Sequence, residues 1–250
     1  MAPQMPTVSS STVAILCGGR GTRLQEHTRE IPKPLVEIGG RPILWHVIQI
    51  YACQGVHRFV LCVGYKGEMI EEFVASCDWP PGLEIVCVQT GIETQTGGRI
   101  KRAAPQLPND RTFHVTYADG VADIDLSLLQ SQHEAHGTLA TMTVVRPELP
   151  FGIAEIAGDG RIRGFKEKPR SDHWINGGFF CLEPGALDYI EPDSILERDP
   201  LERLAADHQL SAFRHEGFWD CMDTYKDALL LNDLWANDKA PWRMWDYAVP

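Results

Sequence analysis

The sequence predicts an α/β protein with a central sheet that is mixed but mostly parallel and is flanked by helices. Two observations carry this prediction. Short apolar runs of strand length alternate with helical segments through the first half, which is typical of parallel strands joined by right-handed crossovers. After Leu139 the strand-like runs come closer together, and the turn signal Ala157–Gly160 separates two of them. We therefore expect a Rossmann-like half followed by a smaller, β-rich portion.

Each expected element follows from the spacing of apolar residues. Val13–Cys17 is a continuous apolar run that ends in glycines, as a buried parallel strand would. Pro184 stands where the first turn of a helix accepts proline. The other expected strands are Leu35–Ile38, Phe59–Val63, Leu83–Val88, Thr112–Tyr117, Leu139–Val145, Gly152–Ile156, Arg161–Phe165 and Phe179–Leu182. The expected helices are Pro42–Cys53, Gly67–Ser76, Gly98–Ala104, Leu126–Ala135, Leu201–Ala206 and Thr224–Trp235, the last with Met222, Tyr225, Leu229 and Leu230 able to share a face.

Length, composition and charge bound the class of protein. With 250 residues and 44% hydrophobic content, residues 12–250 can form one large domain with halves 12–138 and 139–250. Residues 1–11 are small and polar, so we expect a disordered tail and no signal peptide, and no apolar run approaches membrane length. Seven scattered cysteines without a C-x-x-C pair indicate reduced thiols in the cytoplasm. The net charge of −11 argues against a nucleic-acid partner.

A glycine-rich loop, L-C-G-G-R-G-T-R-L, directly follows the first strand. Its glycines let the backbone approach a ligand, and successive N–H groups before a helix form an anion cradle. Arg23 adds a planar positive group suited to phosphate oxygens. The loop lacks both the Lys-Ser/Thr ending of a P-loop and the third glycine of the dinucleotide fingerprint. By itself it predicts an anion site or, equally, a tight strand-to-helix turn.

Three charged residues extend this interpretation. Lys33 lies between Pro32 and Pro34, which fix the backbone and present the lysine from a stiff loop, as a phosphate ligand or as a solvated side chain. Asp119 ends an expected strand and Asp223 precedes the last expected helix. Both suit a Mg²⁺ ion, which uses one or two carboxylates together with phosphate oxygens. An Asx turn or a helix cap remains the alternative for each aspartate.

The pair G-G-x-G-T-R-L and P-K-P resembles the signature of sugar-1-phosphate nucleotidyltransferases. From about Val13 to Trp245 the chain is similar to glucose-1-phosphate cytidylyltransferases. The motifs that carry this similarity are V-E-I-G-G-R-P-I-L-W-H, T-G-G-R-I-K-R, Y-A-D-G-V-A-D, G-F-W-D-C-M-D-T and A-P-W-R-M-W. The resemblance implies the nucleotide-diphospho-sugar transferase fold, with residues 12–138 mainly for the nucleotide and 139–250 mainly for the sugar phosphate.

The resemblance also implies the roles of individual residues. The nucleotide would be bound by Leu16, Gly18, Gly19, Gly21, Thr22, Arg23, Lys33, Gly98 and Arg99. The sugar phosphate would be bound by Gly152, Glu167, Lys168, Asn176 and Gly177. Mg²⁺ would be held by Asp119 and Asp223, which with Arg23 and Lys33 form the catalytic set. The implied partners are a nucleoside triphosphate and a sugar 1-phosphate, and the implied assembly is a homo-oligomer.

The sequence does not determine which nucleotide base and which sugar phosphate the protein uses. Cys17 replaces the usual alanine, Ala118 replaces a glycine, and the segment before Thr96 is shorter than cytidylyltransferases usually have. One alternative is a guanylyl-, uridylyl- or thymidylyltransferase acting on a heptose, octose or cyclitol phosphate. An alternative of a different class is a non-catalytic regulatory protein that binds nucleotide sugars.

Overall fold

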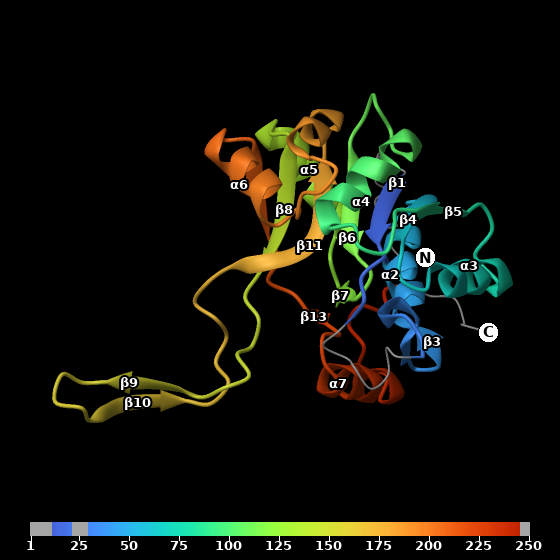
Figure 1. Ribbon diagram of the computed structural model, residues 1–250. Helices are drawn as coiled ribbons and strands as arrows, with labels where there is room; N and C mark the ends of the chain where they lie inside the picture. Colours follow the sequence, from blue (N-terminus) through green and yellow to red (C-terminus); the bar gives the residue numbers. More distant parts are fainter. Residues whose placement is uncertain (1–11, 22–29, 246–250) are drawn as a thin grey trace, which may run out of the picture.

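The computed structural model describes residues 12–21 and 30–245. At its centre lies a seven-stranded sheet in the order β12-β8-β11-β6-β1-β4-β5 (Figure 1). All strands run parallel except β11, which is antiparallel to both of its neighbours. The strands are β1 (Thr12–Leu16), β4 (Arg58–Val63), β5 (Glu84–Gln89), β6 (Phe113–Tyr117), β8 (Ala140–Val145), β11 (Ile175–Leu182) and β12 (Leu210–Arg214). The predicted mixed, mostly parallel sheet is confirmed.

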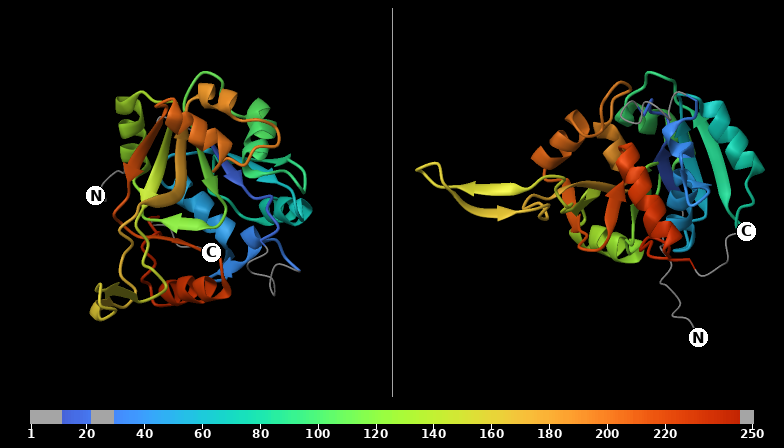
Figure 2. Two further views of the ribbon diagram at one scale, coloured as in Figure 1. Left: turned by 60° about the vertical axis from the view of Figure 1, so that its left-hand side comes forward. Right: turned by 90° about the horizontal axis from the view of Figure 1, so that it is seen from below.

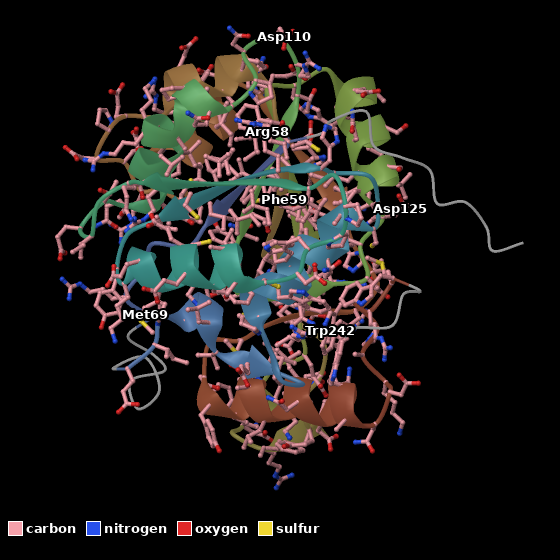
Figure 3. The ribbon with its side chains drawn as sticks, turned by 90° about the vertical axis from the view of Figure 1, so that its right-hand side faces the viewer. Arg58, Phe59, Met69, Asp110, Asp125 and Trp242 are labelled. Atoms are coloured by element: carbon pink, nitrogen blue, oxygen red, sulfur yellow. The ribbon has the colours of Figure 1, made fainter. Side chains whose placement is uncertain are left out.

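Helices cover both faces of this sheet, and β1 at its centre is apolar on both sides. In β1, Val13 and Ile15 face the core formed with α2 (Ile43–Ala52), whereas Ala14 and Leu16 face the core formed with α4 (Thr96–Ala103). Side chains fill the space on either side of the sheet (Figure 3). The α-helices in the described residues are α2 (Ile43–Ala52), α3 (Gly67–Ser76), α4 (Thr96–Ala103), α5 (Leu126–His136), α6 (Asp199–Ala206) and α7 (Tyr225–Ala236). The same residues form the 3-10 helices η2 (Lys33–Leu35), η3 (Ala104–Gln106) and η4 (Pro184–Tyr189).

The last described segment is held by an aromatic cluster. Trp242 is fully buried and Trp245 nearly so, and both pack around His46 of α2 together with Trp235 of α7. His46 Nε2 contacts the Ile38 carbonyl at 2.8 Å, and Trp242 Nε1 donates to His46 Nδ1 at 3.3 Å. Burial lowers the pKa of His46 to about 4, so the ring is neutral at pH 7. The C-terminal tryptophans therefore lock α7 onto α2.

Several boundaries differ from the sequence prediction. The strand expected from Leu35 begins at Glu37, because η2 occupies Lys33–Leu35. The helix expected from Gly98 begins at Thr96, and the strand expected from Phe179 begins at Ile175. The strand expected at Leu35–Ile38 is thus β2 (Glu37–Ile38), whereas sequence patterns missed β12 and the short strands β3 (Arg41–Pro42), β7 (Gly120–Ala122) and β13 (Trp219–Cys221). Strands of two or three residues are too short to show a periodic pattern.

Of the four residues expected to share a face of the last helix, only one is buried. Met222 is buried, but Tyr225, Leu229 and Leu230 on α7 are each about half exposed, at 55%, 52% and 49%. The helix instead buries Ala228 and Leu231. Thr224, and not Asp223, is its N-cap, because the Thr224 hydroxyl accepts a hydrogen bond from the Asp227 amide.

The predicted hairpin is confirmed, but it does not pack on the body of the molecule. Strands β9 (Ile153–Ile156) and β10 (Ile162–Lys166) pair antiparallel and project from the sheet (Figures 1 and 2). We call residues 147–172 the arm. At its base the Trp174 ring lies 4.8 Å from the guanidinium of Arg146 and 5.7 Å from that of Arg214. Glu216 accepts hydrogen bonds from Arg146, so polar contacts fix the point where the arm leaves the body.

All seven cysteines are free thiols, as predicted. Within residues 12–21 and 30–245, every helix is too short or too polar to cross a bilayer.

Candidate active site

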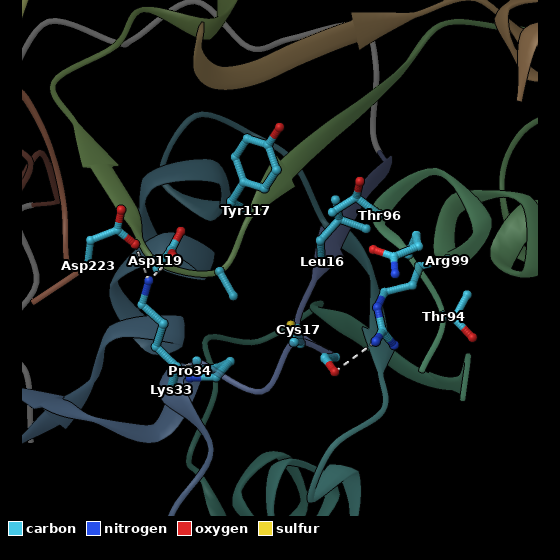
Figure 4. A pocket seen from close by; sticks show the side chains of 15 residues that line it. Leu16, Cys17, Lys33, Pro34, Thr94, Thr96, Arg99, Tyr117, Asp119 and Asp223 are labelled. Carbon is cyan, nitrogen blue, oxygen red and sulfur yellow. Dashed lines mark hydrogen bonds and ion pairs between the residues drawn. The ribbon is translucent and has the colours of Figure 1, made fainter. Parts of the chain in front are cut away.

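A cavity of about 360 Å³ opens at the carboxyl ends of β1 and β6 (Figure 4). Ligands of parallel α/β sheets bind at this edge, so the location matches the prediction. Most of the predicted nucleotide residues that the structure describes lie in its wall, namely Leu16, Gly18, Gly19, Gly21, Lys33 and Arg99. Thr22 and Arg23 lie outside the described residues, and their predicted roles stay predictions.

Lys33, Asp119 and Asp223 meet at one end of this cavity (Figure 4). Lys33 Nζ donates to Asp119 Oδ2 at 2.5 Å and to Asp223 Oδ1 at 2.7 Å. Asp119 lies just after β6, whereas Asp223 lies between β13 and α7. The pairing of β7 with β13 brings the two aspartates together, and the Met222 amide donates to the Asp119 carbonyl at 2.9 Å.

The charge balance of this group favours a cation. Burial alone would lower the pKa of Lys33, but the charge of Asp119 and the hydrogen bonds to both aspartates raise it above its ordinary value. Lys33 therefore stays protonated, and two carboxylates share one ammonium group. Oxygen ligands from two carboxylates fit Mg²⁺, which completes its coordination with water and phosphate oxygens. No cluster of three or more His, Cys, Asp or Glu side chains suited to a metal exists in the described part of the chain.

Arg99 fixes the backbone of the glycine loop through hydrogen bonds. Its guanidinium donates to the Gly18 carbonyl at 2.8 Å and to Thr90 Oγ1 and the Gly91 carbonyl at 2.8 Å each. A Cβ at Gly18 would lie 1.9 Å from Arg99 Nη1, so a side chain there would displace the guanidinium. Arg99 is thus a structural clamp that fixes the loop, and a direct contact with nucleotide stays a prediction.

Gly98 does not line the cavity. Its amide donates to the Ser194 carbonyl at 3.1 Å, and a Cβ on it would lie 2.1 Å from the Pro192 carbonyl oxygen. The close approach that glycine permits here is to protein backbone. The predicted contact between Gly98 and nucleotide is therefore untested.

The predicted sugar-phosphate residues fall into two groups. Asn176 and Gly177 lie within β11, and Asn176 Nδ2 donates to the hydroxyl of Tyr117 in the cavity wall at 3.1 Å. Glu167 and Lys168 are exposed residues of the arm. Gly152 is also in the arm, where a Cβ would lie 2.8 Å from Glu167 Oε2. Lys168 lines a second cavity, of about 690 Å³, between the arm and α7.

Sequence reasoning missed a polar network above the cavity. Tyr117 Oη donates to Glu197 Oε1 at 2.5 Å, and Thr96 Oγ1 donates to Glu197 Oε2 at 2.6 Å. Tyr117 and Thr96 stood within motifs identified from the sequence, but Glu197 lies in a loop without a periodic pattern. Cys17 also lines the cavity, and burial raises the pKa of its thiol well above the ordinary value. It remains a neutral thiol, consistent with a packing role.

A family model described as "Nucleotidyl transferase" matches residues 12–227. The chain belongs to this nucleotidyl transferase family. The predicted family and enzyme class are thereby confirmed. The nucleotidyltransferase is 42% identical to glucose-1-phosphate cytidylyltransferase of Salmonella typhimurium over 258 residues, covering 93% of this chain and 98% of that protein. It is also 42% identical to a Bacillus subtilis protein named "Probable glucose-1-phosphate cytidylyltransferase", covering 92% and 98% of the two chains.

A solved structure confirms the fold of this nucleotidyltransferase. HddC from Yersinia pseudotuberculosis superposes with a TM-score of 0.70 at 23% identity, covering 90% of this chain and 99% of that chain. At this identity the likeness concerns the fold alone. It supports the nucleotide-diphospho-sugar transferase architecture predicted from the sequence.

Proposed function

We propose that this nucleotidyltransferase transfers the cytidylyl group of CTP to glucose 1-phosphate and releases pyrophosphate. The observation that carries the proposal is the group formed by Lys33, Asp119 and Asp223 at the cavity beside the glycine loop. The choice of CTP and glucose 1-phosphate rests on the 42% identity to cytidylyltransferases over nearly the whole chain. We also propose that residues 12–138 mainly bind the nucleotide and residues 139–250 mainly bind the sugar phosphate.

The reaction needs no general base, because the attacking phosphate oxygen is already ionised. It needs positive groups placed to neutralise the charge of the phosphates. A sugar-phosphate oxygen, already ionised at pH 7, attacks the α-phosphorus of CTP while the bond from the α-phosphorus to the β-phosphate oxygen breaks. The protonated Lys33 and the predicted Arg23 would stabilise the negative charge of the reacting phosphates. Asp119 and Asp223 would hold Mg²⁺, which when bound neutralises phosphate charge. The N–H groups of Gly18, Gly19 and Gly21 would bind nucleotide oxygens.

Release of pyrophosphate tests this proposal. We expect CTP with glucose 1-phosphate and magnesium to give pyrophosphate at a rate far above that of GTP, UTP or dTTP with the same sugar. A panel of hexose, heptose and cyclitol phosphates tests the sugar. Activity confined to GTP or UTP would overturn the cytidylyl assignment. An absence of pyrophosphate with every pair of substrates would favour the regulatory protein that binds nucleotide sugars.

We further propose that the protein works as a homo-oligomer held by the arm. The arm exposes large apolar side chains that a monomer leaves in water, namely Phe151, Ile153, Ile156, Ile162 and Phe165. A two-stranded hairpin of this kind is marginally stable alone, so a partner surface is needed to cover it. Residues 161–170 carry five basic groups and one acidic group in a chain of net charge −11. This charge complementarity favours a second copy of the chain as that partner.

The exposed apolar face of α7, which includes Tyr225, Leu229 and Leu230, offers such a surface. An arm that lies against a second copy would also carry Glu167 and Lys168 away from the cavity of their own copy that contains Lys33, Asp119 and Asp223. We therefore expect these two residues to serve the cavity of the neighbouring copy.

Mixing two inactive variants tests this arrangement. Asp223→Asn removes a carboxylate of the cavity beside the glycine loop but leaves the arm intact. Lys168→Met removes the phosphate-binding group of the arm but leaves that cavity intact. If the arm serves a neighbour, subunit exchange between the two variants restores part of the pyrophosphate release, and gel filtration shows an oligomer. A mixture that stays as inactive as its components, or a monomer at working concentration, would contradict the proposal.

A further inference from the structure

The T-G-G segment at the start of α4 holds a neighbouring loop in place. A Cβ at Gly97 would lie 2.4 Å from Ser194 Oγ, and one at Gly98 would lie 2.1 Å from the Pro192 carbonyl oxygen. Thr96 Oγ1 accepts a hydrogen bond from the Leu196 amide at 2.9 Å. The loop 192–197 therefore lies directly on the first turn of α4, and it places Glu197 at a fixed point above the cavity.

Glu197 connects the two halves of the molecule. One carboxylate oxygen accepts from Tyr117 at 2.5 Å and the other accepts from Thr96 at 2.6 Å. Asn176 of β11 donates to the same Tyr117 hydroxyl at 3.1 Å. Tyr117 thus receives one hydrogen bond from the sugar-side strand and gives one to the loop that rests on α4.

The position of Tyr117 supports this arrangement. Its ring lies in the cavity wall between the Asp119–Asp223 pair and Thr96 (Figure 4). A shift of Tyr117 would therefore change both the wall of the cavity and the partner of Asn176.

We propose that Glu197 is a positioning residue, which acts through Tyr117 to hold Asn176 in place for the sugar phosphate. This inference rests on the proposed function, because it assigns Glu197 to the sugar side of the same site. On the nucleotide side, the Gly18 carbonyl is held by Arg99 and not by Glu197. Loss of the Glu197 contact should then affect the two substrates unequally.

Steady-state kinetics of Glu197→Gln test the proposal. We expect KM for glucose 1-phosphate to rise about tenfold, because a hydrogen bond to a charged group is lost, while KM for CTP stays within about twofold. Tyr117→Phe removes the hydrogen bond between Tyr117 and Glu197 by deleting its donor. The double variant should therefore lose no more than the more impaired single variant, as two residues acting through one contact do.

The controls separate positioning from general stability. Tyr189→Phe removes another tyrosine–carboxylate hydrogen bond, to Asp207 at 2.9 Å, and should leave both KM values unchanged. If Glu197→Gln fails to fold, Tyr117→Phe tests the same link with Glu197 in place. An unchanged KM for glucose 1-phosphate in either variant, or effects of the two that simply add, would overturn the proposal. A wild-type protein without pyrophosphate release would instead overturn the proposed function.

Discussion

Replacing Asp223 with asparagine is expected to lower kcat by about 10²–10³-fold, the usual cost of removing one contact to developing charge. The change keeps the shape of the side chain but removes one of the two carboxylates that meet Lys33. Lys33 keeps its partner Asp119, so the free energy of unfolding should change little. Pyrophosphate release under saturating substrates measures kcat, and calorimetry measures Tm.

Asp220 provides a matched control for this experiment. It lies on β13 close to Asp223 in the sequence, but it lines the second cavity between the arm and α7. Burial raises the pKa of Asp220 to about 6, and the hydrogen bond from the Cys221 amide partly offsets this rise. Asp220→Asn should keep near-normal kcat. Turnover of Asp223→Asn within about fivefold of the wild type, against the 10²–10³-fold loss expected, would refute the role of the carboxylate pair.

Replacing Arg99 with alanine is expected to cost about 3 kcal/mol of stability, because several acceptors lose their partner together. Arg99 is only 4% exposed, and it donates to Thr90 Oγ1 and to the carbonyls of Gly18, Gly91 and Ile92. For a chain of this size, that loss corresponds to a Tm lower by roughly 6–12 °C. Because the Gly18 carbonyl loses its hydrogen bond from Arg99, the glycine loop is less well fixed, and the affinity for CTP should fall more than that for glucose 1-phosphate.

Arg102 is the control for Arg99. It lies one turn further along α4, is exposed, and donates to the Thr90 carbonyl at 2.7 Å. Arg102→Ala should cost about 1 kcal/mol, because it removes a single hydrogen bond from an exposed side chain. Equal losses of Tm in the two variants would contradict the clamp assigned to Arg99.

The sequence predicted those parts of the protein that depend on local pattern. Apolar runs identified the parallel strands, and glycines next to β1 identified the loop at the cavity. The strand-end position of Asp119 placed it correctly at the carboxyl edge of the sheet. These features depend on neighbouring residues, whose spacing along the chain determines the outcome.

Long-range pairing could not be predicted in the same way. Asp223 reaches Asp119 through the pairing of β13 with β7, two strands too short to show a pattern. Glu197 reaches Tyr117 because glycines at the start of α4 allow close approach of a distant loop. The exposed face of α7 has the spacing of a core face, and spacing along the chain does not reveal whether a face is buried or exposed.

The fate of labelled phosphate tests the central claim, attack on the α-phosphorus, most directly. CTP labelled at the α-phosphate is incubated with glucose 1-phosphate and magnesium, and a parallel reaction uses CTP labelled at the γ-phosphate. We expect the α-label in a nucleotide sugar and the γ-label in pyrophosphate, each only when both substrates are present. A γ-label on the sugar, or an α-label recovered only as free CMP, would contradict nucleotidyl transfer at this site.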